Sequence, residues 1–214
     1  MFKQAFILSK TINGDYTQWT WNQIPSGVER VEYFWKTYLF PYLSIMRSCF
    51  PITSECFSPE AKFMKGNALA FSDSRGGFVL NDGTTVLSWA GGDTYAPHVF
   101  IYFDINGLKK PNIVGKDIFV MFFRPKGNTV ELARMNSENN EVESEDTYKE
   151  PEIGLYFESS HFKPEDFEST NVRVRYEGQS SYGNVIGCTK DSPGNGCGAY
   201  IQMSGWKIPD KYPW

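Results

Sequence analysis

The chain has 214 residues, of which 41% are hydrophobic and 21% charged, so a packed core is expected and wholesale disorder is excluded. Its formal net charge is −4, which argues against nucleic-acid binding, because proteins of that class carry basic patches. Aromatic residues reach 16%, a content that suits a β-rich core. The length predicts a single globular domain over residues 1–214.

The first part of this domain, residues 1–48, is predicted to be mainly helical. Helical spacing begins at Phe2 and stops at Asn13-Gly14. A second helix is expected from Ser26, whose spacing to Glu29 is that of a capping box. The helical spacing continues to Met46, and Pro41 should kink or split this helix. The residues at this spacing are Phe2, Ala5, Phe6, Ser9, Val28, Val31, Trp35, Tyr38, Leu39, Tyr42, Ile45 and Met46.

The second part, residues 67–214, is predicted to be mainly β. Asn81-Asp82-Gly83 lies between two apolar runs and favours a β-hairpin, because Asp-Gly supplies the positive φ of a tight turn. Further strands are expected at 99–103, 118–123, 129–133, 153–157, 172–176 and 198–203. The strand at 129–133 is expected to pair with 118–123 across a Pro-Lys-Gly-Asn turn. Helices followed by antiparallel strands indicate an α+β fold.

An acidic segment at 136–152 interrupts this pattern with seven acidic residues against one lysine. Such a run of charge is typical of a solvated loop, and the sequence predicts a loop here.

The four cysteines fall into two close pairs, Cys49 with Cys56 and Cys188 with Cys197. Two local pairs favour two short disulfide loops and an oxidising compartment. Four buried free thiols are the alternative. Zinc is less favoured, since neither pair has the short spacing of a zinc ribbon.

No apolar run is long enough to cross a membrane; the run at 37–46 is short and contains Pro41. The first residues also lack the basic and apolar regions of a signal peptide. The sequence thus predicts either a cytosolic protein or a chain without its export segment, and the cysteine pairs favour the second.

Catalytic signatures are lacking, and the expectation is a protein that is not an enzyme. There is no zinc-protease, nucleotide-binding or serine-hydrolase motif. The two histidines, His98 and His161, are each expected to be an ordinary histidine rather than a catalytic base.

The densest polar motif is Asp104–Phe119, between two predicted strands. Asp104 and Asn106 are spaced like the first ligands of a calcium loop, and Asn112 and Asp117 complete a candidate calcium site, although Gly107 comes too early for an EF-hand. The favoured alternative is a turn in which Asp and Asn side chains bond to backbone N–H groups.

This stretch, D-I-N-G-L-K-K-P-N-I-V-G-K-D-I-F, resembles the D-x-N-G…P-N…G-x-D-x-F segment of bacterial type IV pilin-like proteins and type II secretion pseudopilins. The tail, with Gly205-Trp206-Lys207-Ile208 and Tyr212-Pro213-Trp214, resembles the ending of the same group. The start, Phe2–Lys10, is similar to the soluble second half of its long N-terminal helix.

The resemblance implies an N-terminal helix packed on an antiparallel sheet, with a disulfide-bounded C-terminal loop. It implies a non-enzymatic filament subunit whose partners are other pilin or pseudopilin subunits. The chain would be the headpiece of a precursor anchored in the inner membrane by a missing N-terminal hydrophobic helix. Its location would be extracytoplasmic, at the cell surface or in the periplasm. No cofactor follows from it, and calcium stays a candidate.

The alternative function is a secreted, aromatic-rich binding module with carbohydrate as its candidate ligand. Tryptophan rings offer flat faces for stacking. The candidate platforms are Trp19, Trp21, Trp89, Trp206 and Trp214.

Overall fold

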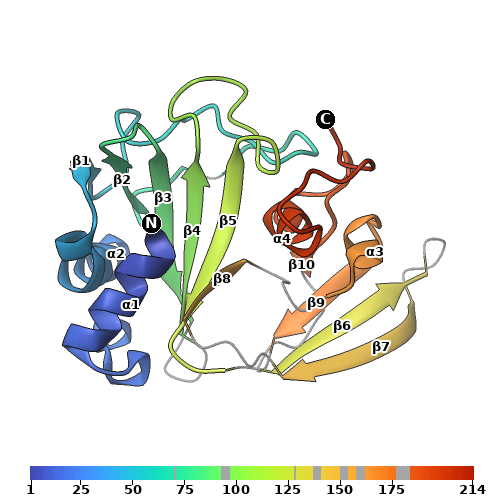
Figure 1. Ribbon diagram of the computed structural model, residues 1–214, viewed down its shortest axis with the longest axis horizontal. Coiled ribbons are helices and arrows are strands. Elements are labelled where there is room, and N and C mark those ends of the chain that lie inside the picture. The colour runs from blue at the N-terminus through green and yellow to red at the C-terminus, as the bar shows by residue number, and fades with distance from the viewer. Residues whose placement is uncertain are drawn as a thin grey trace.

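The computed structural model describes residues 1–69, 71–92, 97–127, 129–136, 141–149, 154–157, 162–176 and 184–214. The fold is α+β, as the sequence predicts. N-terminal helices lie against a six-stranded antiparallel sheet, and a smaller four-stranded sheet with two short helices lies beyond one edge of it (Figure 1).

The first helix, α1, spans Phe2–Asn13 and ends at Gly14, which has a positive φ of 79°. The second, α2, spans Val28–Phe34. Its N-cap is Gly27 without a side-chain hydrogen bond, so the predicted capping box is wrong although the helix is present.

The predicted extension of the second helix to Met46 is also wrong. A π-helical turn over Trp35–Leu39 and a 3-10 turn over Phe40–Tyr42 end the helical region, because Pro41 cannot continue the hydrogen-bond ladder. Strand β1 then spans Ile45–Cys49 and pairs with β2 (Gly76–Leu80). Ile45 and Met46 therefore fit the helical spacing of apolar residues but belong to a strand.

The large sheet has the order β1-β2-β3-β4-β5-β8. The hairpin predicted at Asp82-Gly83 joins β2 to β3, and β4 pairs with β5 as neighbouring strands. Its remaining strands are β2 (Gly76–Leu80), β3 (Thr85–Gly91), β4 (His98–Asp104), β5 (Ile118–Arg124) and β8 (Gly154–Phe157).

The small sheet has the order β10-β9-β6-β7. Its strands are β6 (Thr129–Met135), β7 (Val142–Lys149), β9 (Val172–Tyr176) and β10 (Asn184–Val185). The predicted pairing of 129–133 with 118–123 is wrong, since β6 pairs with β7 and β9 while β8 takes the edge of β5. A turn-like sequence between two strands does not by itself fix their pairing.

The acidic segment is not simply a loop, because β7 occupies most of its described part. Its charge is tolerated at the edge of the sheet, where charged side chains are common. Arg175 on β9 compensates part of it, since a terminal nitrogen lies 3.6 Å from Glu145; its Nε also donates to Glu131 on β6 (2.6 Å). Residues 137–140 and 150–152 of the predicted loop lie outside the described residues.

The segment predicted as a strand at 198–203 is helical. Helix α4 spans Cys197–Met203 and α3 spans Pro164–Phe167. Short apolar runs do not distinguish a strand from a buried helix, and here Ala199 and Tyr200 bury themselves in the core of the small sheet. Figure 1 shows α4 between β5 and the small sheet, in contact with both β5 and α3.

Both faces of the large sheet are buried, because successive side chains of a strand point to opposite faces. Phe123 on β5 packs under α1 and α2, whereas Phe122 faces the irregular segment 52–69 on the other side. A third core lies between the small sheet and α4. Among the described helices, none is long and apolar enough to span a bilayer.

Candidate functional site

The turn between β4 and β5 brings Asp104, Asn106, Asn112 and Asp117 together, as the sequence motif predicts. Asp104 ends β4, and Asp117 immediately precedes β5. Ladder bonding closes the base of the turn, where the N–H of Ile105 donates to the carbonyl of Asp117 (3.0 Å). Asp104 and Asp117 are 1% and 4% exposed, so both carboxylates need partners within the protein.

Asp117 is the centre of the turn's hydrogen bonding. Its Oδ2 accepts from the N–H of Asn112 (2.8 Å) and from the amide of Asn106 (3.2 Å), and its Oδ1 accepts from the N–H of Ile113 (2.7 Å). One carboxylate thus fixes backbone four and five residues before it. Such local bonds compete successfully with regular structure in Asp-rich turns.

Asp104 makes the complementary contacts at the other end of the turn. Its Oδ1 accepts from the N–H of Asn106 (3.1 Å). The amide of Asn112 is oriented so that its nitrogen donates to Oδ2 of Asp104 and to the carbonyl of Lys109, both at 3.1 Å. Burial, together with the nearby Asp117 carboxylate, raises the pKa of Asp104 to about 7.

The four residues therefore form the side-chain-bonded turn that was the favoured alternative at this motif. Each carboxylate oxygen already accepts a hydrogen bond, and a calcium ion would have to displace these donors. Among the described residues, no three His, Cys, Asp or Glu side chains are grouped so as to hold a metal ion.

The C-terminal signature packs directly onto this turn, which the sequence did not indicate. Gly115 has a φ of +90°, and a Cβ there would lie 2.8 Å from Sγ of Cys197. The hydroxyl of Tyr212 donates to the carbonyl of Gly115. On the other side, Gly107 (φ +73°) approaches the backbone of Gly83 in the β2–β3 hairpin. The β4–β5 turn thus contacts both the β2–β3 hairpin and the C-terminal part of the chain.

Both predicted disulfides are present, Cys49–Cys56 and Cys188–Cys197. The first lies in the core between the large sheet and the segment 52–69. The second lies in the core between the small sheet and α4. Two disulfides indicate an oxidising, extracytoplasmic compartment.

The histidines and tryptophans are divided between core and surface. His98 lies on β4 with its ring 5.0 Å from that of Phe100, whereas His161 lies outside the described residues. Trp19 and Trp21 are buried in the core. The ring of Trp89 lies 4.4 Å from that of Phe100 and 4.1 Å from the guanidinium of Arg75. Trp206 and Trp214 are exposed.

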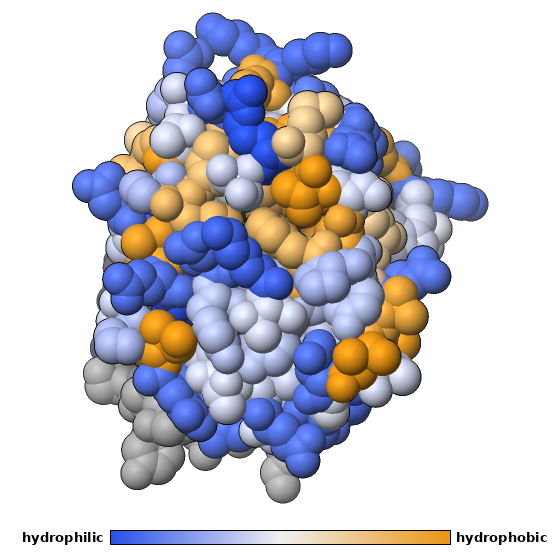
Figure 2. All heavy atoms as spheres, turned by 90° about the vertical axis from the view of Figure 1, so that its left-hand side faces the viewer, coloured by the Kyte–Doolittle hydropathy of each residue, from blue (hydrophilic) through white to orange (hydrophobic). Residues whose placement is uncertain are grey.

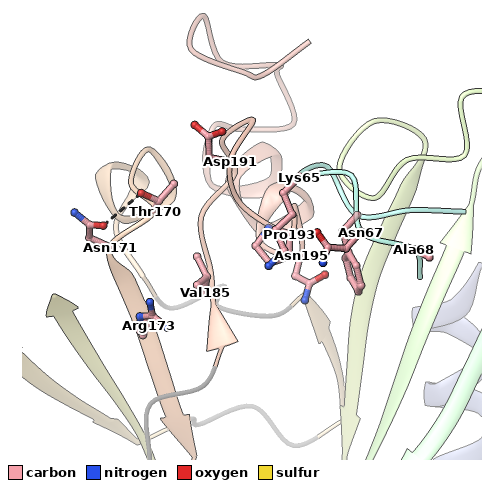
Figure 3. Close-up of a pocket in the computed structure, with 11 residues that line it drawn as sticks. Lys65, Asn67, Ala68, Thr170, Asn171, Arg173, Val185, Asp191, Pro193 and Asn195 are labelled. Carbon is pink, nitrogen blue, oxygen red and sulfur yellow. Dashed lines mark hydrogen bonds between the residues drawn. The ribbon is translucent and has the colours of Figure 1, made fainter. Parts of the chain in front are cut away.

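A cavity of about 750 Å³ lies between the small sheet and two loops, and sequence reasoning missed it. Its polar side chains include Lys65, Arg173 and Asn195 (Figure 3). These residues are far apart in the chain and belong to no motif, so no local pattern could have grouped them.

With this geometry established, the chain was compared with known proteins. No protein-family model, curated protein or solved structure matches it.

Proposed function

We propose that this chain is the headpiece of a filament subunit of the type IV pilin or type II secretion pseudopilin kind, and that α1 contacts neighbouring subunits. The observation that carries the proposal is an exposed aliphatic stripe on α1. Leu8 and Ile12 on α1 are 46% and 72% exposed, and Met1, the N-cap residue just before the helix, is 63% exposed. They are seven and four residues apart, a spacing that places them along one side of the helix.

The body of the protein holds α1 firmly in place. Phe6 is buried, with its ring 5.0 Å from that of Phe123 on β5 and 6.4 Å from that of Trp19. The hydroxyl of Tyr16 donates to the carbonyl of Phe6 (3.2 Å). A helix fixed in this way presents its outer residues as a preformed surface, which lowers the entropic cost of association.

The surface around the stripe also suits a contact between subunits. Figure 2 shows the side of the molecule that carries α1, α2 and β1, where hydrophobic side chains gather among charged ones. Met46 on β1 is also exposed. Full burial of each aliphatic side chain contributes about 1.5–3 kcal/mol, so a few of them supply a substantial part of a subunit interface.

The proposal includes the partners and location that the sequence motifs imply. The partners are other pilin or pseudopilin subunits, and a hydrophobic helix continuing α1 at its N-terminal end would anchor the precursor in the inner membrane. The headpiece would then lie in the periplasm or at the cell surface. The two disulfides support this placement on the oxidising side of the membrane.

Cross-linking of single-cysteine variants tests the proposal. All four native cysteines are in disulfides, so Ile12→Cys adds one free thiol on the stripe and Asp73→Cys adds one at an exposed control position. Each substitution is introduced into the native gene and expressed in its own cells. With a thiol cross-linker, Ile12→Cys should give dimers and larger oligomers, and Asp73→Cys should not. Equal cross-linking of the two variants would refute a specific α1 contact.

The DNA upstream of the Met1 codon gives a second test. An in-frame leader, peptidase site and apolar helix running into Phe2 should be encoded there. A stop codon and ribosome-binding site directly before Met1 would refute the filament mechanism.

Carbohydrate binding through aromatic rings is the second candidate function, and one observation favours it. Trp206 and Trp214 are 67% and 65% exposed, and exposed tryptophan faces are suited to stacking. Trp214 also borders a second cavity of about 530 Å³ with Lys190 and Asp210. A glycan titration should shift the tryptophan fluorescence of the protein, and this shift should be lost in Trp214→Ala. A flat response across neutral and acidic glycans would exclude this candidate.

A further inference from the structure

The cavity beside the small sheet has two polar walls. One wall is β9 with the turn before it, which supplies Asn171 and Arg173. The other combines the segment 63–68 with the loop 191–195, which supply Lys65 and Asn195. Figure 3 shows these two groups facing one another across the cavity, with Val185 of β10 between them.

Arg173 differs from the other arginines of the small sheet. Arg134 forms an ion pair with Asp166 (2.7 Å), and Arg175 bonds to Glu131. Arg173 has no ion pair or side-chain hydrogen bond within the described part of the chain, and its Nε is buried without a partner. Arg173 as a whole is only partly buried and lines the cavity, so the terminal nitrogens of its guanidinium can pair with an anion there.

Amide side chains line both walls, with Asn171 on one and Asn195 on the other. The amide of Asn171 is oriented by a hydrogen bond from the hydroxyl of Thr170 (3.4 Å). Amide groups both donate and accept, and hydroxyl groups of a ligand satisfy both requirements at once.

The charge of the lining selects the class of ligand. Lys65 and Arg173 are opposed by one carboxylate, that of Asp191, which leaves a single excess positive charge among the described lining residues. A single carboxylate on the ligand matches this charge, and arginine binds carboxylates in a two-bond geometry. The volume falls in the range of roughly 300–1,000 Å³ typical of small-molecule sites.

We propose that this cavity binds a sugar bearing one carboxylate, such as a hexuronic acid, with the carboxylate on Arg173 and the hydroxyl groups on the amides of the two walls. This site is separate from α1 and from the exposed tryptophans. A negative result for this site would therefore leave the filament proposal unaffected, and the reverse also holds.

NMR titration of the ¹⁵N-labelled full chain tests the site. Glucuronate should shift the Arg173 Nε–H signal and the backbone signals of Asn171 and Asn195, with a Kd at or below about 1 mM. Glucose and acetate should each bind at least tenfold more weakly, since each offers only half of the recognised groups. No shift with about 10 mM glucuronate, ten times that Kd, would overturn the proposal. Equal binding of acetate would overturn its sugar part, and equal binding of glucose its carboxylate part.

Variants separate binding from folding. Arg173→Gln should weaken glucuronate binding at least tenfold, while its melting temperature stays unchanged or rises, because a buried unpaired donor is removed. Lys65→Gln should weaken binding several-fold and Lys62→Gln, an exposed lysine three residues away, should leave it unchanged. Equal binding by Lys65→Gln and Lys62→Gln, or full binding by Arg173→Gln, would contradict the assigned site.

Discussion

Replacing Asp117 with alanine removes the carboxylate that organises the turn between β4 and β5. The backbone N–H groups of Asn112 and Ile113 lose their acceptor at 2.8 and 2.7 Å. Asn106 loses one too, but its side chain is exposed and water replaces it. Each unsatisfied buried N–H costs about 1–3 kcal/mol, so Asp117→Ala should lower the free energy of unfolding by roughly 2–6 kcal/mol.

Thermal denaturation followed by circular dichroism measures this loss. For a chain of this length, 1 kcal/mol corresponds to about 2–4 °C in melting temperature, so a decrease of roughly 5–20 °C is expected. Asp82→Ala is the matched control. Asp82 also accepts a backbone N–H, that of Thr84 at 2.9 Å, but in an exposed hairpin turn. Losses of equal size in the two variants would refute the central role of Asp117.

The same assay distinguishes a hydrogen-bonded turn from a calcium site. The wild-type melting temperature should be the same in EDTA and in calcium chloride, because hydrogen-bond donors already occupy the oxygens of Asp104 and Asp117. A melting temperature that rises with calcium and falls with EDTA, and that loses this dependence in Asp117→Ala, would identify a bound cation instead.

Three further predictions concern the surroundings of the turn. The pKa of Asp104 is raised to about 7, so the folded protein binds the carboxyl proton more tightly than the unfolded chain does. The free energy of unfolding should therefore fall as the pH rises from about 4 to about 7. Urea unfolding should show no such pH dependence in Asp104→Asn. Gly115→Ala should cost about 1–3 kcal/mol more than Gly66→Ala in thermal denaturation, because both positions have positive φ but only Gly66 has open space around it; equal costs would contradict the close packing. Replacing Cys188 and Cys197 with serine opens a loop with a sequence separation of 9 and should lower the free energy of unfolding by about 3 kcal/mol in a denaturant titration; an unchanged value would contradict this.

Local chemistry made much of the fold predictable from the sequence. Asp82-Gly83 specified the β2–β3 hairpin, and the helical spacing from Phe2 to Asn13 specified α1. The Asp104–Asp117 turn was foreseen because its donors and acceptors lie within one short segment. Both disulfides follow from cysteines that are close in the sequence.

Long-range competition explains the predictions that failed. The helical period that continues to Met46 was overridden by pairing of β1 with β2. The partner of β5 was misassigned because β8, not the adjacent β6, fits its edge. The cavity around Arg173 could not be anticipated, since its walls come from segments that meet only in the folded chain.

The hydrogen bond from Tyr212 to Gly115 has a consequence for how the protein is made. It joins residues 97 positions apart, and Tyr212 is buried. The β4–β5 turn therefore cannot reach its final packing until residue 212 has been synthesised. The last strand of the large sheet, β8, ends at Phe157, so the strands of that sheet can pair while this contact is still missing. Contacts between residues so far apart in the chain are slow to form.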